Sequence, residues 1–475
     1  MVKVKKRDGR LVEFSESKII SAVSKAMIEE GEYKESIAIE IADEIKAVVE
    51  CSTKEFMDIN EIQDLVEGLL IEHGLKKTSK AYILYRSERD RERDTERYGI
   101  LSKEFLSKYK HSKSPMTQLG ELVYYRTYSR FLEDKNRREY WWETVRRAVE
   151  YNCSLIPTTI KEAEELFDNI FNLRQFLSGR TFWVGGTEVA TKYPMANYNC
   201  SFQVIDDYEA FRDVFYLLMI GSGAGVRVLK SDVIKLPKIR TGIDVKNIAY
   251  EPVKKELRLE STSLLFKNDS VEIIIGDSKD GWVQALDFFF RLHYSNEYKY
   301  INIIFINYNN VRPKGEKLKT FGGTASGHTA LLSMFNNIEK VIKKNSDSRE
   351  KKLKPIDCLD ICNHIGAGVV VGGVRRTSEV ILMDSDDKEC IDAKSELYKL
   401  KDGNWVVNEE IIHRQMSNNS IFYEEKPTRE KLHWQINKMR YSGEPAWISA
   451  ENARKRRPNF HGGNPLTNIG GFKRG

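Results

Sequence analysis

The run YINIIFIN at residues 300–307 and the shorter run VEIII at residues 271–275 decide the fold class of this chain. Both runs are rich in β-branched and aromatic residues, which favour strands. Helical stretches and glycine turns separate such runs throughout the sequence beyond Gly185. Strands that alternate with helices predict an α/β domain built around a buried sheet.

The sequence before Gly185 has a different texture. Residues from about 100 to 180 are mostly helical in pattern and rich in Tyr, Trp and Arg, which predicts a helical lobe. Further upstream, VKVKKRDGRLVEF at residues 2–14 places two strand-like runs around Asp8-Gly9, a dipeptide suited to a tight hairpin turn. We therefore predict a small hairpin-containing module, then a helical lobe, then the α/β domain.

Three helices are predicted to follow the hairpin. The first starts after Ser15, and the others cover residues 34–50 and 60–73. The residues expected to cap or end these helices are Ser15, Gly31, Asn60 and Gly74. Residues 85–99 alternate in charge and predict a solvated helix leading out of the module, whose boundary we place near residue 95.

The overall composition is that of a globular protein. Among 475 residues, 41% are hydrophobic, and 76 basic residues nearly balance 70 acidic ones to leave a net charge of +6. This balance does not predict nucleic-acid binding. No apolar run approaches the roughly 20 residues that cross a bilayer, and the start of the chain lacks the apolar core of a signal peptide. We therefore expect a cytoplasmic protein without a membrane partner.

Six cysteines are spread widely along the chain, which does not resemble a secreted disulfide framework. No CxxC pair occurs, and Cys358 and Cys362 have no second ligand pair nearby, so no metal site is predicted. Buried structural thiols and catalytic thiols both remain open interpretations.

The hairpin module carries basic residues that are able to converge on a polyphosphate, although solvated lysines are the ordinary interpretation of such spacing. The segment VKVKKRDGRLVEFSESKI resembles the ATP-cone, a regulatory nucleotide-binding domain at the amino terminus of many ribonucleotide reductases. The resemblance implies that ATP or dATP contacts Val4, Lys6, Arg7 and Lys18. One departure is Met57-Asp58-Ile59, where the family usually has a threonine.

The segment SGRTFWVGGTEVATKYPMANYNCSF at residues 178–202 resembles the adenosylcobalamin-dependent, class II ribonucleotide reductases, at the stretch that carries their first redox-active cysteine. Ribonucleotide reduction removes the 2′-hydroxyl group by radical chemistry, and two thiols supply the electrons by forming a disulfide. An Asn-Cys pair alone would suggest a structural thiol. The resemblance instead implies that Cys200 is a redox cysteine.

A glycine-rich stretch, MIGSGAGVRV at residues 219–228, follows Cys200. We predict a loop in which Gly221, Gly223 and Gly225 let the backbone approach a phosphate or ribose. Neither GxGxxG nor GK[ST] is present, so a Rossmann or P-loop interpretation is not supported. The resemblance implies that this loop lies close to substrate or effector nucleotide.

Three further segments match the family in its own order: GDSKDGW at 276–282, VRPKGEKLKTFGGTASG at 311–327 and DICNHIGAGVVVGGVRRTSEVILMD at 360–384. In isolation each is an ordinary set of glycine turns and buried runs. The resemblance implies an ATP-cone over residues 1–95 and a catalytic domain over 96–465, helical to about residue 180. The rest of that domain would be the first part of a ten-stranded α/β barrel, and residues 466–475 form an unrelated tail.

The approach to residue 465 resembles the finger loop of these reductases, whose pattern is N-P-C-x-E. In the family the asparagine binds substrate, the cysteine forms a thiyl radical and the glutamate is a general base. This chain has Asn464 and Pro465, but Leu466 and Asn468 replace the cysteine and the glutamate. The resemblance therefore implies a substrate contact at Asn464 only.

Two functional interpretations stay open. The first is a ribonucleoside-triphosphate reductase that uses adenosylcobalamin, is controlled by ATP, dATP and dNTP effectors, and is reduced by a thioredoxin-like protein. A DxHxxG cobalamin signature is absent, but the resemblance implies binding at the barrel mouth without it. A second polypeptide would then complete the barrel. The alternative is a catalytically inactive nucleotide-binding fragment from a split, truncated or intron-interrupted gene.

Overall fold

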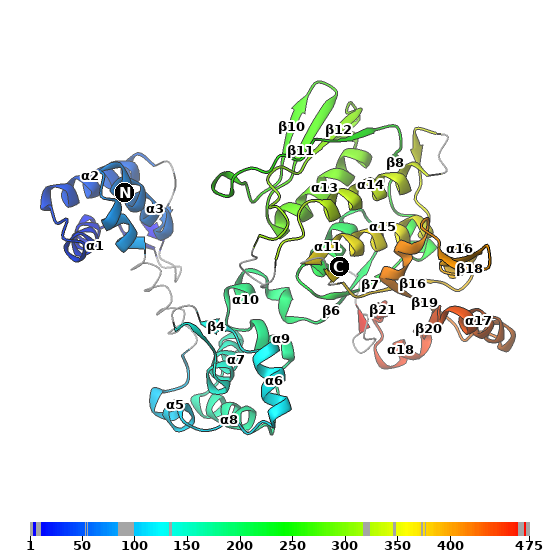
Figure 1. Ribbon diagram of the computed structural model, residues 1–475, viewed down its shortest axis with the longest axis horizontal. Helices are drawn as coiled ribbons and strands as arrows, with labels where there is room; N and C mark the ends of the chain where they lie inside the picture. The colour runs from blue at the N-terminus through cyan, green and yellow to red at the C-terminus, as the bar shows by residue number, and fades with distance from the viewer. Residues whose placement is uncertain are drawn as a thin grey trace. The chain divides into compact units, whose positions relative to one another are not determined.

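The computed structural model describes residues 3–5, 11–52, 54, 56–83, 99–132, 135–316, 324–344, 348–371, 374–375, 377–463 and 470–471. The chain divides into two compact units, which are Met1–Pro115 with Val149–Asn172, and Met116–Ala148 with Leu173–Gly475. Figure 1 labels their helices and strands. None of the described helices combines the length and the apolar character needed to span a bilayer.

The amino-terminal module contains a three-stranded sheet and three helices. Strand β1 (Lys3–Lys5) pairs antiparallel with β2 (Leu11–Glu13) and parallel with β3 (Phe56–Asp58). The helices are α1 (Glu16–Glu29), α2 (Glu35–Cys51) and α3 (Ile59–Glu72). The predicted hairpin and helices are therefore confirmed. Strand β3 was not predicted, because three residues are too few to show an alternating pattern.

The helix ends of this module differ in part from the prediction. Gly31 and Gly74 have φ angles of +69° and +78°, as expected for residues that follow a helix. Ser15 holds the position before α1, but its side chain makes no capping bond. Asn60 does not cap α3; the Asp58 carboxylate accepts the Asn60 N–H at 2.8 Å instead. A carboxylate suits that position because it also complements the positive helix end. The predicted helix over residues 85–99 lies almost wholly outside the described residues.

Residues 101–184 form the predicted helical segment. Its elements are α5 (Lys103–Lys110), α6 (Gln118–Thr127), β4 (Phe131–Leu132), β5 (Arg137–Arg138), α7 (Trp141–Leu155), α8 (Ile160–Phe171) and α9 (Gly179–Val184). In the first unit, Tyr109 packs against Phe167 and donates a hydrogen bond to Asp168. In the second unit, Arg147 binds the buried Glu139 carboxylate and the carbonyl groups of residues 182 and 185.

The main sheet has five parallel strands in the order β20-β19-β16-β7-β6. These strands are β6 (Cys200–Val204), β7 (Gly223–Arg227), β16 (Glu379–Asp384), β19 (Ser417–Tyr423) and β20 (Ala446–Ser449). Helices connect and cover them, among them α11 (Glu209–Met219), α13 (Lys279–Tyr294), α14 (Thr329–Lys343) and α15 (Pro355–Gly368). The prediction of an α/β fold is confirmed.

The two runs that decided the fold class form strands of a separate sheet. Its order is β10-β11-β12-β9, built from β9 (Asp244–Asn247), β10 (Ser263–Lys267), β11 (Ser270–Ile274) and β12 (Ile303–Asn307). Figure 1 shows β10, β11 and β12 at the end of the green region, beyond α13. The two sequence runs used to predict strands therefore belong to this smaller sheet. In the main sheet, β6 (CSFQV) and β7 (GAGVR) contain Cys, Ser and Gly, which give a weaker strand pattern.

The remaining elements are short or peripheral. They are α10 (Glu188–Lys192), η1 (Pro194–Asn197), α12 (Lys230–Val233), β8 (Ile239–Arg240), η2 (Lys255–Leu257), η3 (Asn296–Tyr298), β13 (Glu350–Lys351), β14 (Val370–Val371), β15 (Val374–Arg375), α16 (Lys388–Ile391), β17 (Tyr398–Lys401), β18 (Asn404–Val407), η4 (Ile412–Met416), α17 (Arg429–Ser442), α18 (Ala450–Arg456), β21 (Gly462–Gly463) and β22 (Gly470–Gly471).

Candidate redox-cysteine site

One face of the main sheet gathers the residues that the sequence singled out around Cys200. In the parallel ladder, Cys200 is opposite Gly223, Phe202 is opposite Gly225 and Val204 is opposite Arg227. Residues paired in register in a parallel sheet point to the same side, and alternate residues along a strand do too. The structure therefore brings Cys200, Gly223 and Gly225 together on one face, which we call the cysteine face.

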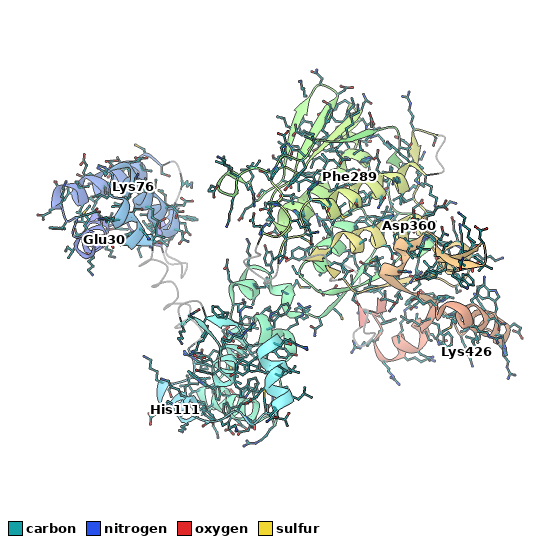
Figure 2. The ribbon with its side chains drawn as sticks, in the orientation of Figure 1. Glu30, Lys76, His111, Phe289, Asp360 and Lys426 are labelled. Atoms are coloured by element: carbon teal, nitrogen blue, oxygen red, sulfur yellow. The ribbon has the colours of Figure 1, made fainter. Side chains whose placement is uncertain are left out.

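The opposite face of the sheet is closed by helices. Ala224 and Val226 of β7 and Ile381 of β16 belong to a large buried core that includes residues of α11, α13, α14 and α15. Figure 2 labels Phe289 of α13 and Asp360 of α15, two of the buried residues in these covering helices. Since this face is filled, chemistry at the sheet is confined to the cysteine face.

Gly223, opposite Cys200, and Gly225, opposite Phe202, add no side chains of their own to that face. The predicted glycine-rich loop is wrong for Gly223 and Gly225, which lie within strand β7, a wholly buried strand. A central position between β6 and β16 supplies hydrogen bonds to both edges, and this pairing overrides the weak strand propensity of glycine. Only Gly221 lies in a turn, with φ +80°. At Gly223 itself, a neighbouring group would meet backbone, because glycine has no side chain.

Arg180 of α9 holds the two segments that flank the site. Its Nε donates a hydrogen bond to Oδ1 of Asn199 at 3.0 Å, and Nη2 donates to the carbonyl oxygen of Gly221. Burial lowers the pKa of the Arg180 guanidinium, and the negative charge of a Cys200 thiolate counteracts this shift. Sequence reasoning did not single out Arg180 within its segment, because its partners lie 19 and 41 positions away.

The segment that leads toward Asn464 lies on the cysteine face. Arg227 donates two hydrogen bonds to the buried Asp232 carboxylate, at 2.8 and 3.1 Å, and a third to the carbonyl oxygen of His461 at 2.8 Å. A Cβ atom on Gly462 would overlap the ring of Phe202 and lie 2.9 Å from a methyl carbon of Leu382. The backbone therefore passes directly over the sheet at residues 461–463. Asn464 itself is outside the described residues.

The predicted nucleotide contacts of the amino-terminal module are not assembled in the described residues. Val4 is buried, with 4% of its surface exposed, between Val12 and Met57 in the small sheet. Lys18 is exposed on α1. Lys6 and Arg7 lie outside the described residues, so the structure shows no geometry for a phosphate contact there.

The other cysteines differ from Cys200 in their surroundings. Cys358, Cys362 and Cys390 are buried in the helix-covered core, and burial raises the pKa of each thiol. Cys51 is exposed and Cys153 is partly buried, and neither lies near the main sheet in sequence or pairing. Among the described residues, no three His, Cys, Asp or Glu side chains come together as a metal site.

Comparisons with known families and structures agree with this arrangement. Family models match an ATP cone domain at residues 2–91, a ribonucleotide reductase alpha domain at 101–187 and the insertion domain of B12-dependent ribonucleotide reductases at 238–342. The last match covers the smaller sheet β10-β11-β12-β9, which explains why that sheet is separate from the main one.

Individual relatives give the same result. The adenosylcobalamin-dependent ribonucleoside-triphosphate reductase of Lactobacillus delbrueckii subsp. bulgaricus is 31% identical over 66% of this chain and 47% of its own length. The enzyme of the same name from Lactobacillus acidophilus is 31% identical over 67% of this chain and 48% of its own. A crystal structure of a B12-dependent, class II ribonucleotide reductase matches with a TM-score of 0.67 and 26% identity, covering 78% of this chain and 56% of that one.

A cone domain, a reductase alpha domain and a parallel sheet with a cysteine beside buried glycines define a ribonucleotide reductase. Within that class, the chain belongs to the B12-dependent, class II family. It spans about half the length of the curated relatives it matches.

Proposed function

We propose that this chain contributes the nucleotide-binding face and one redox thiol of an adenosylcobalamin-dependent ribonucleoside-triphosphate reductase. The observation that carries the proposal is the position of Cys200 opposite Gly223, on the face crossed by the backbone of residues 461–463. On the basis of that site, we assign to this chain the activity, cofactor and triphosphate substrate that the relatives' names give.

In this reaction the 2′-hydroxyl group of the ribonucleotide leaves as water, while two thiols lose two electrons and two protons and become a disulfide. Cys200 is one of these thiols, and Asn464 is the proposed substrate contact at the end of the segment anchored by Arg227. Gly223, opposite Cys200, is the proposed neighbour of the ribose, because it adds no side chain beside the sulfur atom. A thioredoxin-like protein in the cytoplasm would reduce the disulfide again.

Adenosylcobalamin would supply the radical that starts this chemistry. The described residues do not themselves identify a binding site for this cofactor. No DxHxxG sequence occurs, and no cluster of metal-ligating side chains is found among the described residues. The assignment of the cofactor therefore rests on the relatives, and the roles of Cys200 and Asn464 are derived without it.

Protection of Cys200 from alkylation tests the proposed site in the intact chain. A ribonucleoside triphosphate should slow the reaction of Cys200 with iodoacetamide several-fold, because bound ribose covers the sulfur. Alkylation of the exposed Cys51 serves as the internal control and should not change. Equal rates at Cys200 with and without saturating nucleotide would contradict a nucleotide site at this face.

Leu466 favours the second candidate function, an inactive nucleotide-binding chain, for this polypeptide by itself. The family resemblance places the radical cysteine at this position, and leucine has no S–H bond from which hydrogen is transferred. We expect no deoxynucleotide from the purified chain supplied with adenosylcobalamin and a dithiol, while nucleotide binding persists. A second polypeptide that supplies the missing groups would restore turnover. Turnover by the chain alone would contradict our assignment of Leu466.

The amino-terminal module is the proposed site of control by ATP or dATP, with Val4, Lys6, Arg7 and Lys18 as its contacts, and dNTP effectors act elsewhere in the reductase. The match to the ATP cone domain supports this. Titration calorimetry with ATP should detect binding to the chain. The variant Lys18→Ala should weaken it, whereas Lys25→Ala on the same helix should not.

A further inference from the structure

We propose that Arg180 is a positioning residue for Cys200: it ties the residue before the thiol to the turn that leads into β7, and it stabilises the thiolate that forms there. This inference rests on the proposed redox role of Cys200 and extends it to a residue on another element, α9. Neither the sequence motifs nor the family matches assign a role to Arg180.

The hydrogen bonds of Arg180 connect three segments. Its Nε bonds the side chain of Asn199, the residue immediately before Cys200, and its Nη2 bonds the carbonyl group of Gly221. The same Asn199 accepts the N–H of Gly223 at its carbonyl oxygen, at 2.8 Å. One guanidinium group thereby joins α9 to the start of β6 and to the turn that leads into β7.

The turn at Gly221 is shaped around the guanidinium. A Cβ atom at Gly221 would lie 3.2 Å from both Nη1 and Nη2 of Arg180, and the positive φ angle of +80° also disfavours any larger residue. The Trp183 ring, with its centroid 5.3 Å from the guanidinium carbon, lies on the same helix. The cation is therefore held in place by contacts on several sides rather than extended into solvent.

The charge of this cation acts on Cys200. Nη1 of Arg180 is buried, and no acceptor for it is found among the described residues. Burial lowers the pKa of the Arg180 guanidinium, and attraction to a Cys200 thiolate raises it again. Partial burial strengthens such an interaction, because the local dielectric constant is lower than that of water. A cation beside a cysteine favours its thiolate form.

Within the described residues, the groups that surround Cys200 are mostly uncharged. Asn199 precedes Cys200 and Ser201 follows it, Gly223 lies opposite on β7, and β22 contributes glycines. Helix α11 also packs against β6, but on the opposite face, and its charged residues Glu209, Arg212 and Asp213 form ion pairs with one another. Arg180 is thus the cation recorded with Cys200 in the described part of the chain.

The pH dependence of alkylation at Cys200 measures this effect without requiring turnover. In that reaction the thiolate sulfur displaces iodide from iodoacetamide, so the rate follows the thiolate fraction. The intact chain and its Arg180→Gln and Arg180→Lys variants would be alkylated between pH 6 and 10, and the modified peptides quantified by mass spectrometry. Cys51 is exposed, so its alkylation rate reports any change in reactivity that is not specific to Cys200.

We expect Arg180→Gln to raise the midpoint for Cys200 by about one pH unit, which is a roughly tenfold slower reaction at neutral pH. Arg180→Lys keeps the charge and should recover at least half of the shift. An unchanged midpoint in Arg180→Gln, or equal midpoints in the two variants, would overturn the proposal. Melting curves recorded in parallel show whether each variant is folded.

A measurement on the unaltered chain gives an independent result if the variants do not fold. The midpoint for Cys200 should be lower in the native chain than in urea, where the contact with Arg180 is lost. A native midpoint equal to or above the unfolded one would overturn the proposal. Nucleotide protection of Cys200 is measured separately. If nucleotide does not protect Cys200 but Arg180→Gln still raises the alkylation midpoint, the proposed function is contradicted and the role of Arg180 is not.

Discussion

Asp360 shows how a single residue holds the covering helix α15 to η4, the short helix that precedes β19. Its carboxylate accepts hydrogen bonds from Arg414 at 2.6 and 2.9 Å and contacts His413 at 2.9 Å. Burial by itself raises the pKa of Asp360, but the hydrogen bonds from Arg414 and His413 outweigh it and hold the pKa far below its usual range. The group is therefore charged at all ordinary pH values.

The variant Asp360→Asn should destabilise the second unit by about 3–5 kcal/mol, because it leaves the buried Arg414 without a counter-charge. Urea unfolding measures this loss. The matched control is Asp392→Asn, which breaks an ion pair with Lys438 whose two side chains are 41% and 37% exposed. That change should cost less than about 1 kcal/mol. Equal effects of the two variants would refute the structural role of Asp360.

His364 makes stability depend on pH. Its ring stacks on His413 at 4.0 Å between centroids, and burial, aided by the charge of His413, lowers its pKa to about 3. The unfolded chain binds a proton near pH 6.5 whereas the folded chain does not, so stability is lost as the pH falls from about 6.5 toward 3. At pH 5 the loss is about 2 kcal/mol relative to pH 7.

The variant His364→Phe keeps the ring stack and removes the titration. Its unfolding free energy should decline less between pH 7 and pH 5 than that of the unaltered chain, as urea titrations at both pH values would show. His293 is buried too, with a pKa lowered to about 4 by burial, so it leaves a similar slope in both proteins. Parallel slopes for the variant and the unaltered chain would mean that His364 does not titrate as described.

At the scale of elements, the contact between β21 and β6 depends on a glycine. Gly462→Ala would force a methyl group into the Phe202 ring, and overpacking of this kind costs about 1–3 kcal/mol. Phe202→Leu should relieve part of that cost, so the double variant should be more stable than the sum of the single changes predicts. Thermal unfolding of the four proteins measures this coupling.

A matched glycine substitution is available in α3. Gly68 lies within the helix and has no atom within 4 Å of where its Cβ would lie, so Gly68→Ala should stabilise that helix by about 0.5–1 kcal/mol. If Gly462→Ala were as harmless as Gly68→Ala, the segment at residues 461–463 would not lie against the sheet as the structure has it.

The elements also show what sequence patterns do and do not reveal. The periodic helices of the first module, and strands such as YINIIFIN, were predictable because their own residues favour those structures. Strand β7 was not, since glycines form it only when strands on both sides supply hydrogen bonds. Asp58 caps α3 instead of Asn60 because the helix begins at Ile59, one residue earlier than predicted.

At the scale of the whole molecule, long-range contacts limit prediction of the site. Cys200 and its glycines were found from local sequence, and the register between β6 and β7 then joined them. Arg180 and Arg227 were missed because their partners lie up to 234 positions away, as with the carbonyl group of His461. Only folding brings these groups together, so a local motif can identify the thiol but not the residues that position it.

The separation of hydrophobic cores leads to a prediction about independent folding. Among the described residues, the core of the amino-terminal module is made of residues between 4 and 82, and the core around the main sheet is made of residues between 205 and 423. A polypeptide of residues 1–95 therefore contains the described core of this module, and its size is sufficient for a small domain.

We expect residues 1–95 to unfold cooperatively on heating and to bind ATP, because Val23, Ile41 and Ile45 are fully buried within this segment alone. The variant Ile41→Asp should abolish the transition, since it buries a carboxylate in that core without a described counter-ion. Ile39→Asp is the matched control on the same helix, because 42% of the Ile39 side chain is exposed, and it should leave the transition nearly unchanged. Circular dichroism against temperature distinguishes these outcomes.

A segment 1–95 without a cooperative transition would show that the module depends on the helices α5 and α8 that share its unit, and the boundary at residue 95 would then be wrong.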